Sequence, residues 1–333
     1  MIMAGTSSEK GTGEQPPKPP STGRRRRARW SRSDRHNLLV GLAFISPWLI
    51  GFVFLTLYPT LASLYYSFTD FKILQVPRWV GLANYTQMFN DPLFWKSLWN
   101  TFYLTLIGTP LSVVVALGIA MLLNIKGIRG IGTFRTIFFL PVIFPAVAAT
   151  ILWLWLLNPP YGLVNQLLAM IGIHGPGWFY DAAWAKNGII LITIWAAGDV
   201  IIIYLGALQG VPRTLYEAAE VDGAGPWTRF RHVTIPMISP AILFNLITQG
   251  IAAFQSFDKA YVVSQGIGIN GAAVGGTQNS LLFYGLNLYN AAFRYFHMGY
   301  ASALAWVLLV IILFATFGLL RISRNRVYYE GEP

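Results

Sequence analysis

Six apolar runs, each about as long as a bilayer-spanning helix, account for much of this chain of 333 residues. About 20 consecutive apolar residues are enough for one crossing of a lipid bilayer. The runs cover residues 38–58, 101–123, 136–157, 189–208, 241–263 and 300–320. We expect the first run to end at Tyr58-Pro59, and Pro141 and Pro145 to kink or unwind the third. The sequence therefore predicts an all-α polytopic membrane protein with six transmembrane helices.

The composition agrees with helices that face lipid. Hydrophobic residues make up 55% of the chain and charged residues only 11%, whereas a soluble domain carries about 25% charged residues. Much of the surface must then face lipid rather than water. The chain has no cysteine, which excludes a disulfide framework, a thiolate nucleophile and a cysteine-ligated metal.

The distribution of basic residues predicts the orientation. Residues 1–36 are rich in Gly, Pro, Ser and Arg, which is typical of a disordered tail. Cytoplasmic segments carry an excess of Lys and Arg, so both termini and the segment 211–240 are expected in the cytoplasm, on either side of a transmembrane domain over residues 37–320. Residues 321–333 then form a cytoplasmic C-terminal tail. The cluster of arginines in residues 24–35 of the N-terminal tail indicates contact with anionic lipid. Contact with nucleic acid is not indicated, because no basic groove with interleaved aromatic residues follows.

The segment 211–240 is the most charged one outside the N-terminal tail, and it lies between two apolar runs. A short helix is expected after Pro212, with a capping box formed by Thr214 and Glu217. Gly223 is expected to end this helix in a left-handed conformation, and Pro226 to begin a second helix. Two short helices bent around a glycine make a projection that a groove in a partner protein could hold.

The residues of this segment occur in the order of a known motif. Glu217-Ala218-Ala219, Gly223 and Ile235-Pro236 follow one another with the spacing of the EAA loop, so the segment resembles that of binding-protein-dependent ABC importer permeases. The resemblance implies the type I importer permease fold and a coupling helix that docks into a cytoplasmic ATPase. The residues that it assigns to ATPase coupling are Glu217, Ala218, Ala219, Asp222, Gly223, Ile235 and Pro236.

Other motifs are similar to the sugar-type permeases of this family. They include Gly81-Leu82-Ala83-Asn84-Tyr85, Phe139-Leu140-Pro141 and Gly299-Tyr300-Ala301-Ser302-Ala303. The glycine-rich stretch 266–280, in a loop that lies near the binding protein in the family, departs from the family pattern. The resemblance implies a subunit in the cytoplasmic (inner) membrane that forms the pathway for a sugar or related polyol. Its implied partners are a second, homologous permease, two ATPase subunits and an extracytoplasmic substrate-binding protein.

The chain itself is not expected to bind ATP or to be an enzyme. It contains no G-x-x-x-x-G-K-[ST] sequence, so the nucleotide must be bound by another subunit. The four histidines are scattered, without metal-ligand spacing, and no metal site or other cofactor is predicted.

Candidate residues for a substrate path lie in the fourth and fifth runs. Asp199 is near the middle of the fourth run, where a carboxylate costs about 2.5–3.5 kcal/mol, so it either faces an aqueous cavity or is a hydrogen-bonded structural group. Trp195 offers an aromatic face for a sugar ring or simply packs. Asn245, Gln249 and Ser256 follow at near-helical spacing, either as a polar face or as contacts between helices.

An alternative class is a secondary transporter driven by an ion gradient. Such a protein is expected to carry intramembrane carboxylates or histidines and inverted repeats. Only Asp199 fits the first of these features, and no repeat is evident in the sequence.

Overall fold

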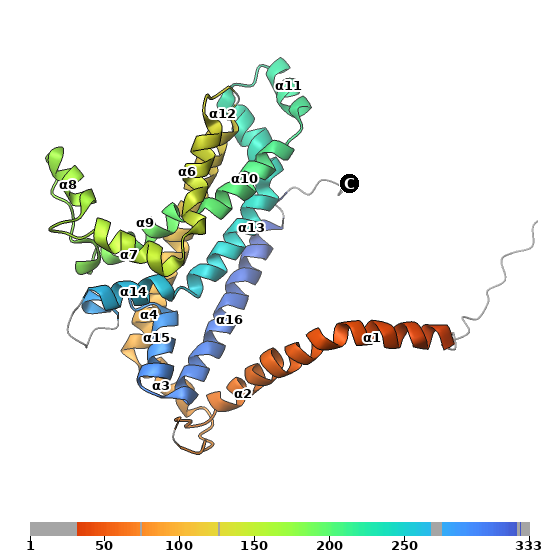
Figure 1. The fold of residues 1–333 in the computed structure, drawn as a ribbon, viewed down its shortest axis with the longest axis vertical. Coiled ribbons are helices and arrows are strands. Elements are labelled where there is room, and N and C mark those ends of the chain that lie inside the picture. The colour runs from red at the N-terminus through yellow and green to blue at the C-terminus, as the bar shows by residue number, and fades with distance from the viewer. Residues whose placement is uncertain (1–31, 74, 126, 268–274, 325–326, 328–333) are drawn as a thin grey trace, which may run out of the picture. The chain divides into compact units, whose positions relative to one another are not determined.

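The computed structural model describes residues 32–73, 75–125, 127–267, 275–324 and 327 of the chain (Figure 1). Within these residues the regular secondary structure is helical, apart from the isolated bridges Thr69–Trp79 and Lys72–His297. Two compact units, 1–59 and 60–333, divide the chain. The predicted tail 1–36 lies outside the described residues as far as residue 31, and a helix begins at Arg32. Residues 268–274 of the departing stretch 266–280 also lie outside them.

The α-helices follow one another along the whole described chain. They are α1 (Arg32–Phe52), α2 (Tyr58–Ser67), α3 (Ala83–Asn90), α4 (Pro92–Tyr103), α5 (Thr109–Asn124), α6 (Ile131–Ile143), α7 (Ala146–Leu156), α8 (Leu163–Met170), α9 (Ala185–Trp195), α10 (Gly198–Gly210), α11 (Arg213–Val221), α12 (Pro226–Arg229), α13 (Ile235–Phe254), α14 (Asp258–Gly266), α15 (Tyr284–Tyr289) and α16 (Met298–Ser323). Short 3-10 turns cover Trp178–Tyr180 and Thr277–Asn279, and π-helical turns cover Val53–Leu57, Leu104–Gly108, Phe230–Thr234 and Asn290–Arg294.

The six predicted spans are found as four single helices and two bent pairs. The single helices that are long and apolar enough to cross a membrane are His36–Ser67, Pro92–Asn124, Pro226–Phe254 and Met298–Ser323. The pairs are α6 with α7, bent by 107°, and α9 with α10, bent by 47°. Counting each pair as one span gives six spans in the described chain, which agrees with the prediction.

Three of the prolines inside the long helices lie two residues after a π-helical turn. Pro59 follows the turn Val53–Leu57, Pro110 follows Leu104–Gly108, and Pro236 follows Phe230–Thr234. A proline lacks the N–H that would bond four residues back, and its ring collides with that carbonyl. A wider turn ahead of the ring relieves this conflict. The prediction that the first run ends at Tyr58-Pro59 is therefore wrong, because the helix continues to Ser67.

The third and fifth runs both break, in different ways. In the third, Phe144 is extended (ψ 133°) and precedes Pro145, as expected of a residue before proline. The predicted interruption is confirmed there and amounts to a sharp bend. In the fifth, the helix ends at Phe254 and α14 begins at Asp258, so the prediction of one helix over 241–263 is wrong.

Buried polar side chains tie α4 to the segment before α15. Asn100 is buried, and its Nδ2 donates to the carbonyls of Asn279 (2.9 Å) and Leu282 (3.0 Å). The buried hydroxyl of Thr101 accepts from the backbone N–H of Tyr284 at 2.8 Å. Leaving such a group unpaired costs about 1–3 kcal/mol. These bonds fix segments more than 170 residues apart in sequence beside each other.

Two apolar clusters lie on either side of the candidate site. In one, α9 packs with α14 and with residues 281–286; in the other, α10 packs with α5 and the start of α13. The helices α5, α9, α13 and α14 are thereby held in a fixed arrangement. A polar pocket is lined by these four helices.

Candidate functional site

The segment 211–240 contains the bent pair of helices that its sequence predicts. At the end of α11, the Gly223 N–H donates to the Glu220 carbonyl (3.0 Å) and the Ala224 N–H to the Ala219 carbonyl (2.9 Å). These two bonds form a Schellman motif, which needs a left-handed residue after the helix. Gly223 has φ +76°, so the predicted left-handed cap is confirmed. The predicted capping box is wrong, since no side chain caps the start of α11, which follows Pro212.

The second helix of the segment is the beginning of the fifth span. Pro226 begins α12, which continues through a π-helical turn into α13, so one helix extends from Pro226 to Phe254. Arg229 pairs with Glu220 at 3.1 Å, and the Tyr216 hydroxyl lies 3.0 Å from the Thr234 hydroxyl. The short helix α11 is therefore attached to the start of the fifth span, the end that is predicted to lie in the cytoplasm (Figure 1).

The predicted coupling residues fall into two groups. Those from Glu217 to Gly223 lie on or beside α11, which buries none of its residues within the chain. Ile235 and Pro236 are instead half-buried in the long helix. The most exposed large apolar side chains of the segment are Val221, exposed by 89%, and Trp227, exposed by 71%. An exposed projection with apolar side chains is typical of a surface that binds another protein.

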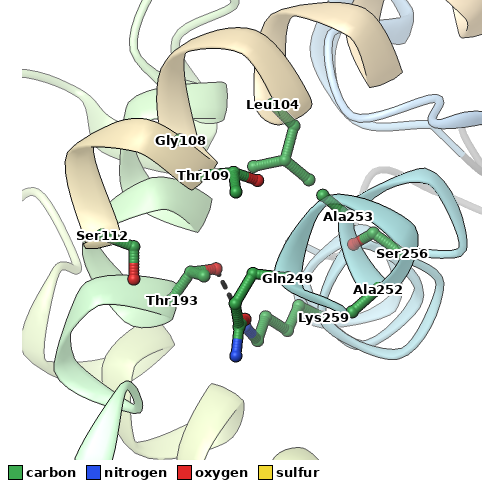
Figure 2. A pocket seen from close by; sticks show the side chains of 10 residues that line it. All are labelled: Leu104, Gly108, Thr109, Ser112, Thr193, Gln249, Ala252, Ala253, Ser256 and Lys259. Atoms are coloured by element: carbon green, nitrogen blue, oxygen red, sulfur yellow. Dashed lines mark hydrogen bonds between the residues drawn. The ribbon is translucent and has the colours of Figure 1, made fainter. Parts of the chain in front are cut away.

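A small polar pocket lies between four helices (Figure 2). Its volume is about 90 Å³. Its walls are formed by Leu104, Gly108, Thr109, Ser112, Thr193, Gln249, Ala252, Ala253, Ser256 and Lys259. A larger cavity of about 510 Å³ lies among α4, α5, α13 and α16, but its lining is almost wholly apolar. Of these two, the small pocket is the one that offers an ammonium group, Lys259, and a side-chain amide, Gln249, besides hydroxyl groups.

Lys259 brings a positive charge to this pocket. Its Nζ donates to the Thr193 hydroxyl at 2.8 Å, and that hydroxyl in turn donates to the Ile189 carbonyl at 2.9 Å. Lys259 belongs to α14, after the end of the fifth span. Burial lowers the pKa of its ammonium to about 8, against the opposing influence of the Asp258 and Asp199 carboxylates.

Asp199 is not in the middle of a continuous helix. The break at Ala196 and Ala197 places it in the first turn of α10, where the helix dipole favours a negative charge. Gly198 before it lies against α6, because a Cβ there would come within 2.6 Å of Val142 Cγ2 and 2.9 Å of the Phe138 carbonyl oxygen. Oδ2 of Asp199 accepts a hydrogen bond from the Gln249 amide at 3.4 Å.

The structure brings together three of the five predicted path residues. Gln249 and Ser256 line the pocket, and Asp199 is bonded to Gln249. Asn245 is 1% exposed and donates to the Ala241 carbonyl of its own helix at 3.0 Å. Trp195 packs against other rings, with centroids 6.2 Å from Phe144 and 5.8 Å from Trp153. Asn245 and Trp195 do not line the pocket.

Sequence reasoning missed the groups opposite Gln249. Thr109 and Ser112 are three residues apart in the second span, and this spacing could have indicated a polar face. Lys259 could not have been assigned in this way, because it enters the pocket only through the break after Phe254. Thr193, in the fourth span, also lines the pocket.

Comparisons with known proteins agree with this architecture. The sequence model of a family described as "binding-protein-dependent transport system inner membrane component" matches residues 94–327. The chain is 41% identical to the probable ABC transporter permease protein YesP of Bacillus subtilis over 305 residues, covering 91% of this chain and 96% of the relative. It is 36% identical to the lactose transport system permease protein LacF of Rhizobium radiobacter over 290 residues, covering 86% and 94%.

A solved structure shares the fold. It is a bacterial ABC transporter involved in the import of the acidic polysaccharide alginate, with a TM-score of 0.73 and 22% sequence identity over 88% of this chain and 98% of the matched chain. The helical spans, the family match over residues 94–327 and the close relatives together show that this chain is an ABC importer permease and belongs to the family of binding-protein-dependent transport system inner membrane components.

Proposed function

We propose that this chain, together with a second and homologous permease subunit, forms the pathway of an ABC importer for a sugar or related polyol. The segment 211–240 docks into one of two cytoplasmic ATPase subunits, which bind the ATP, and an extracytoplasmic binding protein delivers the substrate. The name of LacF, a lactose transport permease, supports a sugar as the substrate class. An ion-gradient-driven transporter is not favoured, because the family depends on binding proteins.

The geometry of the segment 211–240, which we call the coupling segment, supports the proposal. Val221 and Trp227 expose large apolar side chains on a projection that is braced by the Arg229–Glu220 ion pair. A partner that covers these side chains removes them from water. Each Å² of apolar area buried in this way favours the complex by about 25 cal/mol. A rigid connection to the fifth span would transmit movement of the ATPase to the pathway.

The positive charges favour a cytoplasmic position for this segment. Arg213, Arg229 and Arg231 lie in it, and Arg321 and Arg324 follow at the end of the last span. By the positive-inside rule, both segments belong on the cytoplasmic side. An ATPase subunit could then reach the segment.

Affinity purification tests this function. A tagged form of the full chain, expressed from its native chromosome and solubilised in mild detergent, is expected to retain an ATP-hydrolysing subunit and a second permease. Val221→Glu and Trp227→Glu together should remove the ATPase but not the permease, because both side chains are exposed in the isolated chain.

The matched control is Met170→Glu on α8, which places a charge on a side chain that is 80% exposed and far from the coupling segment along the chain. It should retain the ATPase. Equal recovery of the ATPase with all variants would refute docking through this segment.

A further inference from the structure

The polar pocket contains donors that the described residues do not satisfy. A lysine ammonium has three N–H donors, and within the described chain Nζ of Lys259 has one hydrogen-bond acceptor, the Thr193 hydroxyl. The Ser112 hydroxyl, which lines the same pocket, is buried (1% exposed) and has no partner among the described residues. Buried donors of this kind favour an occupant with strong acceptor oxygens.

The nearby carboxylates do not neutralise Lys259 directly. In the described residues the ion pairs within 4.0 Å are Lys72–Asp70 and Arg229–Glu220, so neither Asp258 nor Asp199 is in contact with the ammonium. Asp258 is exposed, and Asp199 is hydrogen-bonded to Gln249 on the rim of the pocket. The charge of Lys259 is therefore not cancelled by a direct ion pair, while the carboxylates of Asp258 and Asp199 both remain close enough to act on it.

The volume limits what the pocket can hold. One water molecule needs about 10–15 Å³ of cavity volume, so a cavity of about 90 Å³ has room for a carboxylate or a sulfonate. A sugar that used this pocket would insert one substituent. Gln249 and Ser256, which also line the pocket, would lie beside this substituent.

We propose that Lys259 binds the anionic substituent of an acidic saccharide, such as the carboxylate of a uronic acid, with Ser112 and Thr193 completing the site. This inference rests on the proposed sugar pathway and names the class of sugar. A hydrogen bond between two charged groups is about twice as strong as a neutral one, so the pocket prefers the acid over the corresponding neutral sugar. The Asp199 carboxylate beside it weakens the attraction, which allows the substrate to leave.

Direct binding to matched sugars tests the inference. The transporter complex containing the full chain is reconstituted in nanodiscs without the binding protein, and saturation-transfer NMR measures the affinities of methyl glucuronide and methyl glucoside and of the corresponding galacto pair. The two members of a pair differ only at C6. The uronides are expected to bind about tenfold more tightly than the neutral sugars, which corresponds to about 1.4 kcal/mol.

Variants of the pocket give effects of opposite sign. Lys259→Gln should abolish the preference for the uronides, Lys259→Arg should keep it, and Asp199→Asn should increase it because an opposing charge is removed. The matched control is Lys186→Gln on α9, whose ammonium bonds to Asn100 at 3.3 Å outside the pocket and which should not change the preference.

Equal affinity for uronides and neutral sugars in the wild-type complex would overturn the inference, as would a preference that survives in Lys259→Gln. Should Lys259→Gln fail to assemble, the comparison of the wild type with Asp199→Asn decides the question. None of these results depends on ATP hydrolysis. Failure here would leave docking of the coupling segment untouched, and loss of docking would leave a uronide preference measurable.

Discussion

The side-chain amide of Gln249 donates to the Asp199 carboxylate at 3.4 Å, so the middle of α13 is connected to the first turn of α10. Both groups belong to helices that also line or adjoin the polar pocket. The carboxylate is held by an amide and a helix N-terminus together. This arrangement explains how a charge is tolerated within an apolar run.

We expect Asp199→Asn and Gln249→Leu to reduce substrate uptake by roughly tenfold. Both remove a hydrogen bond to a charged group, which contributes about 1.5–3 kcal/mol, and Asp199→Asn also removes the charge that allows the substrate to leave. Assembly with the ATPase and basal ATP hydrolysis should change much less. Uptake into proteoliposomes, normalised to the amount of assembled complex, measures the effect.

Asn245→Leu is the control for these variants, because Asn245 is buried against its own helix and does not line the pocket. It should lower the yield of complex without changing uptake per complex. If Asp199→Asn behaves like Asn245→Leu, Asp199 is a structural group and the substrate path lies elsewhere.

Gly223→Leu should leave the protein inserted in the membrane but uncouple ATP hydrolysis from uptake. A Cβ at Gly223 meets no atom within 4 Å in this chain, so a leucine there starts from open space and is expected to collide with a docked partner. Some strain arises in addition, because φ is +76°. ATPase activity stimulated by the substrate-loaded binding protein, measured with uptake, reports the coupling.

Gly172→Leu is the control for the backbone strain that a leucine introduces at Gly223. Gly172 has φ +77° and equally open surroundings, but it follows α8 rather than the coupling segment. Its leucine variant should stay coupled. Equal loss of coupling in both variants would show that backbone strain, and not docking, is responsible.

Glu217→Lys should weaken the association with the ATPase without destabilising the permease. Glu217 is exposed, and the ion pair of α11 with the second helix is made by Glu220 instead. Glu220→Gln removes only this partly exposed pair, which is worth about 0–1 kcal/mol, and should affect binding less. Co-purification at increasing salt concentration ranks the variants, and a larger loss with Glu220→Gln would contradict a docking role for Glu217.

Local sequence signals predicted the helices and the coupling segment, because both depend on nearby residues. Gly223 and Pro226 act on their own backbone, and the apolar runs are long enough to require helices in lipid. The bends within the spans were harder to predict from the sequence. Pro145 indicated one, but no proline marks the break between α9 and α10, where tight packing of Gly198 against α6 coincides with the bend.

The pocket depended on contacts that sequence spacing does not contain. Gln249 and Ser256 lie in one predicted run, and their shared face was predictable. Lys259 joins them only because the helix stops at Phe254. Thr193, which accepts its hydrogen bond, lies 66 residues earlier in the sequence. The prediction that the first helix ends at Pro59 was also wrong, because a π-helical turn allows this proline to remain inside a helix.

The 107° bend between α6 and α7 makes the number of membrane crossings testable. One broken span places the segments before α6 and after α7 on opposite sides, whereas a re-entrant pair would return the chain to the same side.

The chain has no cysteine, so single cysteines can be introduced without background at Ile128, Ile173, Val221 and Ile322, all of which are exposed. With six crossings, a membrane-impermeant maleimide added to intact cells or spheroplasts should label Ile173→Cys alone. The other three should react only after permeabilisation, as the basic residues near them predict. Labelling of Val221→Cys from outside would indicate a re-entrant pair and would remove the coupling segment from the reach of a cytoplasmic ATPase.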